Sequence, residues 1–234
     1  MYDVAVIGGG LVGSYTAYRL AGMGYGVVVL EQRKQLGGQV CCTGIVSQEC
    51  MEAFAIDNNL VLRQLNSARL FSPSGKLVRL WRKEPQASVL DRAAFNLAMA
   101  KRAQAQGVDY RLDNFATDLE VRDSDVIVRA TCQGGGVDFQ ARVAVVANGF
   151  GSKFADSSGL GKVSDFAAGA QAEVDVSGVD EVEVYFDQEI APGFFAWLVP
   201  TSPRRARVGL LARRNPGLYL KRLVLKLLNE GKVI

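Results

Sequence analysis

The chain has 234 residues, of which 49% are hydrophobic and 22% are charged. This composition is typical of a globular protein with a buried core, and it excludes disordered, collagen-like and coiled-coil chains. The sequence contains no histidine, which excludes Ser-His-Asp catalysis, Cys-His catalysis and histidine-ligated zinc. Any chemistry must therefore use Cys, Tyr, Lys, a carboxylate or a bound cofactor.

The net charge of +3 is unevenly distributed. Residues 201–234 hold nine of the 27 Lys and Arg side chains but only one acid, Glu230. Such a basic segment indicates either a solvated face or a nearby polyanion or anionic membrane surface. Among possible polyanions, we do not expect nucleic acid to be a partner.

The cysteine pattern and the N-terminal residues indicate where in the cell the protein is found. None of the four cysteines forms a C-x-x-C pair, so we expect no metal site and reduced thiols. The first residues lack the basic segment of a signal peptide, and the uncharged stretch 4–18 is too short and glycine-rich to span a membrane. These features predict a cytoplasmic protein, either free in solution or at a membrane surface.

The first 31 residues predict a β-α-β unit. Apolar runs at 2–7 and 27–30 have the pattern of buried strands, and residues 11–23 have the pattern of a helix. Residues 33–50 then predict a long loop with a short helix after Ser47, and 68–80 predict a hairpin.

Later segments predict a second helix over 91–106, with Asp91 as its cap, and a series of strands. The expected strands are 108–112, 116–121, 126–131, 142–147, 169–174, 182–186, 194–199 and 207–211. A final helix over 216–229 carries an apolar stripe. We therefore expect a nucleotide-binding domain over residues 1–160 with the hairpin as an insertion, and the start of a β-rich substrate domain over 161–234.

A glycine motif joins the first strand to the first helix. Gly8-Gly9-Gly10-Leu11-Val12-Gly13 matches G-x-G-x-x-G, and Glu31 ends the second strand near the spacing expected for a ribose-binding acid. Gly8 would make the tight turn, Gly10 would let a pyrophosphate approach, and Gly13 would allow close helix–strand contact. The helix N-terminus offers free N–H groups to phosphates. A glycine-rich turn without a ligand is the alternative.

Two features indicate which dinucleotide binds: Glu31, and the long loop and hairpin that follow the second predicted strand. Glu31 disfavours a 2′-phosphate, which leaves FAD or NAD. A plain NAD domain continues through further β-α repeats, whereas here about 60 residues of loop and hairpin follow. This excursion favours FAD, since a flavin protein must also house the isoalloxazine ring.

Four further segments carry a family resemblance. They are Val40-Cys41-Cys42-Thr43-Gly44-Ile45-Val46-Ser47, Leu90-Asp91-Arg92-Ala93-Ala94-Phe95-Asn96, Ala147-Asn148-Gly149-Phe150-Gly151-Ser152 and Pro192-Gly193-Phe194-Phe195-Ala196-Trp197-Leu198-Val199-Pro200. With the glycine motif, they make the chain resemble the geranylgeranyl reductase family of flavoproteins, within the class shaped like p-hydroxybenzoate hydroxylase. The resemblance implies an α/β fold: a Rossmann-like FAD-binding domain (GR2-type) with an antiparallel-sheet substrate domain.

The resemblance also implies a function. It is that of an FAD-dependent oxidoreductase that reduces isolated C=C bonds of geranylgeranyl (isoprenoid) lipids, with NAD(P)H or another reductant as electron donor. Cys42 is implied as the catalytic candidate beside the flavin. The implied FAD-binding residues are Gly8, Gly10, Val12, Gly13, Glu31, Arg33, Cys42, Thr43, Gly44, Arg92, Ala116 and Gly149. The implied substrate-lining residues are Phe195, Trp197 and Pro200.

The chain departs from the family pattern at several positions. Asn96 and Asn148 replace aspartates, Ile45 replaces a glycine, and Phe195 and Val199 stand for Tyr and Phe. The late Gly-Asp motif of the family is missing, which predicts a fragment without the second FAD motif.

Alternatives remain open for both residues and function. Cys42 is otherwise a buried inert thiol, Arg92 an ordinary helix residue, and the aromatics core residues of a sheet. The alternative functions are a flavin-dependent monooxygenase or halogenase of the same class and a non-catalytic nucleotide-binding or membrane-associated module.

Overall fold

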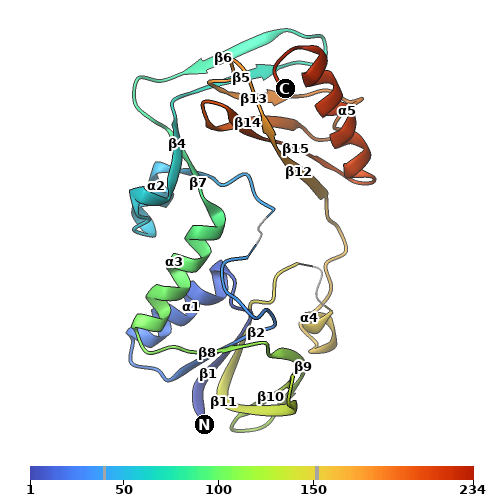
Figure 1. Ribbon diagram of the computed structural model, residues 1–234. Helices are drawn as coiled ribbons and strands as arrows, with labels where there is room; N and C mark the ends of the chain where they lie inside the picture. The colour runs from blue at the N-terminus through green and yellow to red at the C-terminus, as the bar shows by residue number, and fades with distance from the viewer. Residues whose placement is uncertain (39–40, 151–152) are drawn as a thin grey trace. The chain divides into compact units, whose positions relative to one another are not determined.

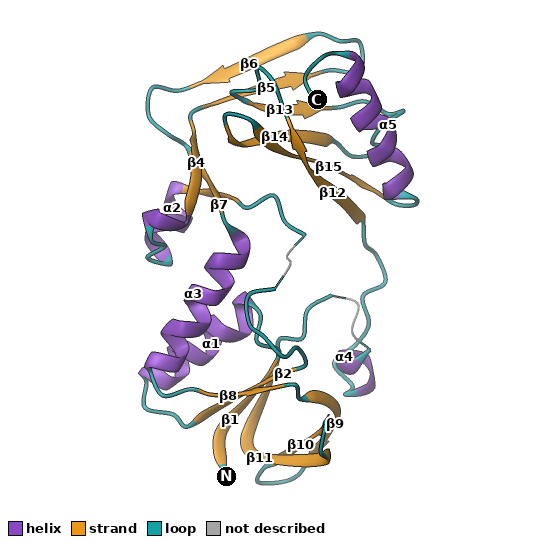
Figure 2. Ribbon diagram, in the orientation of Figure 1, coloured by secondary structure: helices purple, strands orange, loops and turns teal. Residues whose placement is uncertain are grey.

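The computed structural model describes residues 1–38, 41–150 and 153–234 (Figure 1). The chain divides into two compact units, and each is made of two separate stretches of sequence. Unit 1 comprises Met1–Val40 and Ala93–Val163, and unit 2 comprises Cys41–Arg92 and Ser164–Ile234. Both contain helices and strands, and the mixed α/β class with an antiparallel sheet is confirmed (Figure 2).

A six-stranded sheet forms the centre of unit 1, in the order β8-β2-β1-β11-β10-β9. Its strands are β1 (Tyr2–Ile7), β2 (Val27–Glu31), β8 (Asp109–Leu112), β9 (Phe115–Val121), β10 (Val126–Cys132) and β11 (Gly135–Val146). β8, β2, β1 and β11 run parallel, whereas β9, β10 and β11 form an antiparallel meander. The adjacent strands β1 and β2 are largely buried, as their continuous apolar sequences predict.

The two faces of this sheet have separate cores. Val4, Val6 and Val29 lie on one face with Ala17 of α1 (Leu11–Gly22) and Ala103 of α3 (Arg92–Ala105). The alternate residues of β1 and β2 pack on the other face with β9, β10 and the short helix α4 (Phe154–Ser157). The β-α-β pattern of the first 31 residues is therefore confirmed.

A second six-stranded sheet dominates unit 2, in the order β12-β15-β14-β13-β5-β6. Its strands are β5 (Ser67–Phe71), β6 (Leu77–Trp81), β12 (Ala168–Asp175), β13 (Val182–Tyr185), β14 (Ala196–Ser202) and β15 (Arg205–Ala212). Every pair is antiparallel except β5 with β13. Helix α5 (Pro216–Asn229) covers one face through Leu223 and Leu227, so the predicted apolar stripe packs on the sheet.

A three-stranded sheet packs near the other face of the large sheet. It consists of β3 (Ile45–Ser47), β7 (Ala87–Leu90) and β4 (Val61–Leu65), with α2 (Gln48–Ala53) and the 3-10 turn η1 (Asn58–Leu60) between them. Leu65 and Val89 of the small sheet join Val182 and Val199 of the large one in a shared core. These short strands are absent from the sequence-based elements, because no long periodic run marks them.

The hairpin predicted at 68–80 exists as β5 and β6, but it lies in unit 2. The structure therefore differs from the predicted placement of this hairpin as an insertion within residues 1–160. The physical reason is that β5 pairs along its length with β13, more than 100 residues later in the chain, from Ala68 opposite Val182 to Phe71 opposite Tyr185. Such a non-local pairing leaves no signal in local sequence patterns.

Candidate functional site

The glycine motif lies where the strand order of the unit 1 sheet reverses. β1 has β2 on one side and β11 on the other, and the loop after β1 begins at this point. A Cβ on Gly8 would lie 2.4 Å from the Ala147 carbonyl oxygen, and its φ of +110° also favours glycine. In open α/β sheets, ligands bind at the carboxyl ends of strands at such a reversal.

Gly13 brings α1 into contact with the turn. A Cβ on Gly13 would lie 1.9 Å from the Gly8 carbonyl oxygen and 3.3 Å from a methyl group of Val6. The helix could not approach β1 this closely with any side chain at that position. The expected role of Gly13 in close helix–strand contact is confirmed.

The N-terminus of α1 has the features of a phosphate-binding site. Gly10 is the N-cap, no side chain among the described residues caps the helix, and the first turn holds no acid. A Cβ on Gly10 would meet no described atom within 4 Å, so the space over the helix end is open. Val12 in the first turn is 69% exposed. The partial positive charge and the free N–H groups at this end favour an anion.

Glu31 fixes the glycine loop from the end of β2. Its Oε2 accepts a hydrogen bond from the Gly9 N–H at 2.8 Å, and its Oε1 accepts one from the Arg33 N–H at 2.9 Å. A carboxylate has about four acceptor positions, so it can still accept bonds from ribose hydroxyls. Sequence reasoning did not foresee this second task of Glu31.

The hydroxyl groups of Tyr110 and Ser14 also hold the glycine loop by hydrogen bonds. Tyr110 donates to Ser14 Oγ at 2.8 Å, and Ser14 donates to the Gly9 carbonyl oxygen at 3.2 Å. Burial raises the pKa of the Tyr110 hydroxyl above its ordinary value, so the group stays a proton donor. The glycine loop is thus held on both sides by hydrogen bonds that leave its outer face open.

Three predicted cofactor residues, Gly8, Glu31 and Ala116, share a cavity of about 80 Å³ in unit 1. Its other lining residues are Ile7, Leu30, Gln32, Asn114, Phe115, Asn148 and Phe154. This volume is far smaller than a dinucleotide, so the cavity could hold only a part of such a ligand. Gln32, Asn114 and Phe115 were missed from sequence, and only their places at strand ends could have indicated them.

The residues of unit 1 fit a dinucleotide such as FAD. The open space over Gly10, the uncapped helix end and the acid at the end of β2 are the three parts of a dinucleotide-binding turn. The chain's own backbone would hold the pyrophosphate, and Glu31 would hold a ribose.

Unit 2 brings five further predicted residues, Cys42, Thr43, Gly44, Phe195 and Trp197, together in an apolar cavity of about 330 Å³. It is lined by Cys42, Thr43, Gly44, Ile45, Val182, Val184, Phe195, Trp197 and Val199. The cysteine loop and the aromatic residues are about 150 positions apart in sequence, yet they face one space. Val182 and Val184 were missed as lining residues, although the alternation along their strand was visible.

A second apolar cavity of about 410 Å³ borders the first. Ile45 and Val182 line both cavities, and Leu80 and Trp81 of β6 lie on the far side of the second. The two volumes lie in the range of small-molecule sites.

Gly44 allows the cysteine loop to approach β7. Its φ is +82°, and a Cβ there would lie 2.6 Å from the Leu90 carbonyl oxygen and 3.2 Å from Cγ of Arg92. Its own carbonyl oxygen accepts a hydrogen bond from the Leu90 N–H at 2.9 Å. Arg92, the first residue of α3, therefore lies beside Gly44, as the two predicted motifs require if they serve one site.

The aromatic residues form one wall of the cavity. The ring centroids of Phe195 and Trp197 are 6.0 Å apart, and the Trp197 indole lies across Gly209, where a Cβ would come within 2.5 Å of the ring. Alternation along β14 places Trp197 and Val199 on the cavity face and Pro200 on the opposite face. Pro200 is buried and is not among the described residues that line the cavity.

Six of the predicted cofactor residues are not among the lining residues of these cavities: Gly10, Val12, Gly13, Arg33, Arg92 and Gly149. Arg33 contacts Glu31 through its backbone N–H, and Gly149 follows β11 with a φ of +77°. Three residues of the quoted motifs, Val40, Gly151 and Ser152, lie outside the described residues. Within the described ranges no group of three His, Cys, Asp or Glu side chains could hold a metal ion, and no helix is long and apolar enough to cross a membrane.

Known proteins are similar to this chain over its full length. The family model for FAD dependent oxidoreductases matches residues 3–82. The digeranylgeranylglycerophospholipid reductase of Methanosarcina acetivorans is 30% identical over 100% of this chain and 62% of its own length. A geranylgeranyl bacteriochlorophyll reductase-like protein of Thermoplasma acidophilum superposes with a TM-score of 0.86 at 25% identity, over 100% of this chain and 64% of that one.

The chain is an FAD-dependent oxidoreductase by family, and over its whole length it is similar to geranylgeranyl reductases. It spans less than two thirds of the length of these two relatives. A myxobacterial chondrochloren halogenase also superposes, with a TM-score of 0.73 at 15% identity over 99% of this chain and 58% of its own, which shows a common fold alone.

Proposed function

We propose that the protein reduces isolated C=C bonds of geranylgeranyl lipids with FAD as its cofactor. The observation that carries the proposal is the 330 Å³ cavity in which Cys42, Phe195 and Trp197 face one space. The relative in Methanosarcina acetivorans, which matches the whole chain, bears the name of a reductase of such lipids. Residues of this kind around an apolar cavity suit an isoprenoid chain, which has no polar group to satisfy.

In this proposal FAD supplies hydride to the alkene when bound. Gly8, Gly10, Val12 and Gly13 bind its pyrophosphate through the turn and the end of α1, and Glu31 binds the adenosine ribose. The remaining proposed contacts come from Arg33, Thr43, Gly44, Arg92, Ala116 and Gly149. NAD(P)H or another reductant returns the electrons.

The cavity residues exclude water and place the alkene. Phe195, Trp197 and Val184 present apolar surfaces on one side, and Ile45 leads into the second cavity, which gives a long chain further room. Cys42 lines the same cavity, and its thiol is proposed to supply the proton that the second alkene carbon takes up when hydride reaches the first.

The test is reduction of a geranylgeranyl glycerophospholipid by the purified intact protein with FAD, followed by mass spectrometry. Each saturated bond adds two hydrogens to the lipid. Replacing Cys42 by Ser is expected to lower kcat by about 10²-fold, which is the usual size of a proton-transfer contribution. Cys132→Ser is the matched control, because Cys132 is exposed at the end of β10 in unit 1.

Three results would contradict the proposal. They are a hydroxylated or halogenated product without a saturated one, a colourless protein that refuses added FAD, and equal activity in Cys42→Ser and Cys132→Ser. The first points to a monooxygenase or halogenase, and the second points to a non-catalytic module. The third removes Cys42 from the proton step.

We also infer that the protein contacts anionic lipid surfaces through the outer face of α5. The inner face, with Leu223 and Leu227, packs on the sheet, whereas Leu218, Lys221 and Leu225 are exposed at helical spacing. Each basic residue near an anionic surface contributes about 1 kcal/mol to binding. Lys221→Glu removes one such contribution and adds a repelled negative charge, so it is expected to weaken binding to phosphatidylglycerol vesicles by at least about fivefold.

The control for this inference is Lys76→Glu, which makes the same charge change at an exposed position of the β5–β6 turn. Equal binding by the two variants, or equal binding to phosphatidylcholine and phosphatidylglycerol vesicles, would contradict the inference. Sedimentation with vesicles measures both.

A further inference from the structure

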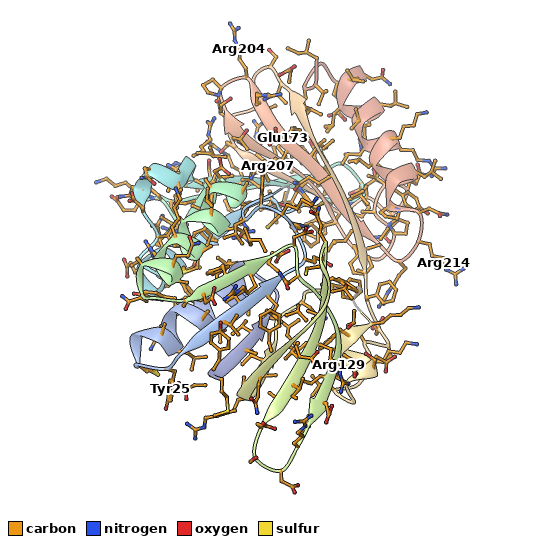
Figure 3. All side chains as sticks on the ribbon, turned by 60° about the horizontal axis from the view of Figure 1, so that its bottom comes forward. Tyr25, Arg129, Glu173, Arg204, Arg207 and Arg214 are labelled. Carbon is orange, nitrogen blue, oxygen red and sulfur yellow. The ribbon has the colours of Figure 1, made fainter. Side chains whose placement is uncertain are left out.

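Arg207 of β15 is a buried charged residue that the proposed reaction does not use. Only 9% of its surface is exposed. Its Nη1 donates hydrogen bonds to the carbonyl oxygens of Thr43 at 2.8 Å and Leu90 at 3.1 Å, and its Nε lies 3.4 Å from Oε1 of Glu173. Figure 3 labels Arg207 and Glu173 on neighbouring strands of the large sheet. Burial of a guanidinium is costly unless such partners surround it.

The two carbonyl groups belong to segments that pair with each other. Leu90 ends β7, and its N–H donates to the Gly44 carbonyl oxygen at 2.9 Å. Arg207 therefore bonds to both sides of one junction, which is the point where the cysteine loop meets the small sheet. A single Arg side chain joins the large sheet to the loop and to β7 at once.

A second contact ties the same loop to the next strand. Thr43 Oγ1 lies 3.1 Å from Oε1 of Gln171 on β12 and donates a hydrogen bond to it. Gln171 and Glu173 are two positions apart on β12, opposite Gly209 and Arg207 of β15, and thus lie on the face that carries Trp197. The large sheet holds the loop by a backbone contact and a side-chain contact on adjacent strands.

Cys42 immediately precedes the residue that these contacts hold. We propose that Arg207 is a positioning residue, which fixes the backbone of Thr43 and Gly44 and through it presents Cys42 to the cavity of Phe195 and Trp197. The effect on catalysis rests on the proposed reductase function, whereas the effect on the loop does not. Lys cannot replace Arg207, because a single ammonium group lacks the planar fork of donors that reaches both carbonyl groups and Glu173.

The first test measures amide hydrogen exchange in the intact protein and in its Arg207→Gln and Arg207→Lys variants. Exchange is expected to be about tenfold faster in segments 43–47 and 87–91, since each variant loses at least one charge-assisted bond to a carbonyl group there. Exchange of the unit 1 strands is expected to stay unchanged. Glu173→Gln is the matched control, because it weakens an exposed contact and leaves both carbonyl bonds in place.

Two exchange results would overturn the proposal. One is unchanged exchange in 43–47, and the other is an equal increase over the whole chain, which would show a general stabilising role only. Arg207→Gln removes a buried charge as well as the loop contacts, so the Lys variant, which keeps the positive charge, separates a local effect on the loop from a general effect on the folding of unit 2.

The second test measures alkylation of Cys42 by iodoacetamide in a protein whose other three cysteines are replaced by Ser. Arg207→Lys is expected to change the alkylation rate by at least threefold and to lower kcat about tenfold. An unchanged alkylation rate would overturn the proposal. Altered exchange and alkylation in a protein that reduces no lipid would support the positioning of the loop and refute the reductase function.

Discussion

The candidate site of unit 1 is formed mainly by backbone atoms, whereas that of unit 2 is formed mainly by side chains. In unit 1 the backbone forms the site: Gly8, Gly10 and Gly13 matter because they lack side chains, and α1 contributes its free end. In unit 2 side chains from distant segments form the candidate site, since Cys42 and Trp197 line one cavity. A backbone site depends on short sequence spacing, whereas a side-chain site depends on which strands become neighbours.

The largest expected effect tests the backbone site. Gly13→Ala places a Cβ 1.9 Å from the Gly8 carbonyl oxygen, and backbone cannot move aside cheaply. We expect a loss of about 3 kcal/mol of unfolding free energy together with the loss of FAD binding. Urea unfolding measures the stability, and flavin absorbance measures the binding of FAD.

Gly22→Ala in the same helix is the control, since its Cβ would meet no described atom within 4 Å. It is expected to change stability by less than about 1 kcal/mol. Equal effects of the two substitutions would show that close packing at Gly13 is not required.

A smaller effect is expected where unit 2 also depends on a glycine. Gly209→Ala would place a Cβ 2.5 Å from the Trp197 ring, and the ring can yield by moving into the cavity. We expect a cost of about 2 kcal/mol, a shifted Trp197 fluorescence in a Trp81→Phe background and a higher KM for the lipid. Gly169→Ala on β12 is the control, because its nearest new contact is an ordinary 3.5 Å to Leu211. Unchanged fluorescence in Gly209→Ala would contradict the placement of the indole.

The smallest effect concerns a carboxylate that holds α5 to unit 2. Burial alone would raise the pKa of Asp187, but hydrogen bonds from Lys226 at 3.0 Å and from the Glu189 N–H at 2.9 Å outweigh it and lower the pKa. A lowered folded-state pKa stabilises the protein above the ordinary value near 3.9, and this contribution is lost as the pH falls through the folded-state pKa.

Asp187→Asn is therefore expected to cost about 1 kcal/mol at pH 7 and to flatten the loss of stability below about pH 4. Thermal unfolding between pH 7 and pH 2.5 measures this. Asp175→Asn, at a carboxylate that is 67% exposed, is expected to cost less than about 0.5 kcal/mol. If Asp187→Asn loses stability below about pH 4 as steeply as the unsubstituted protein, the contact between Asp187 and Lys226 does not hold α5.

The sequence alone determined the elements whose signals are local. The first β-α-β unit, the glycine turn and α5 follow from apolar periodicity and glycine spacing, because a tight turn or an amphipathic helix is specified by residues a few positions apart. Only the tertiary structure decided that β5 pairs with β13, that Glu31 bonds to Gly9, and that Arg207 reaches Thr43 and Leu90. Those contacts join residues 22 to 164 positions apart, and no local pattern records them because they arise only when distant strands form one sheet.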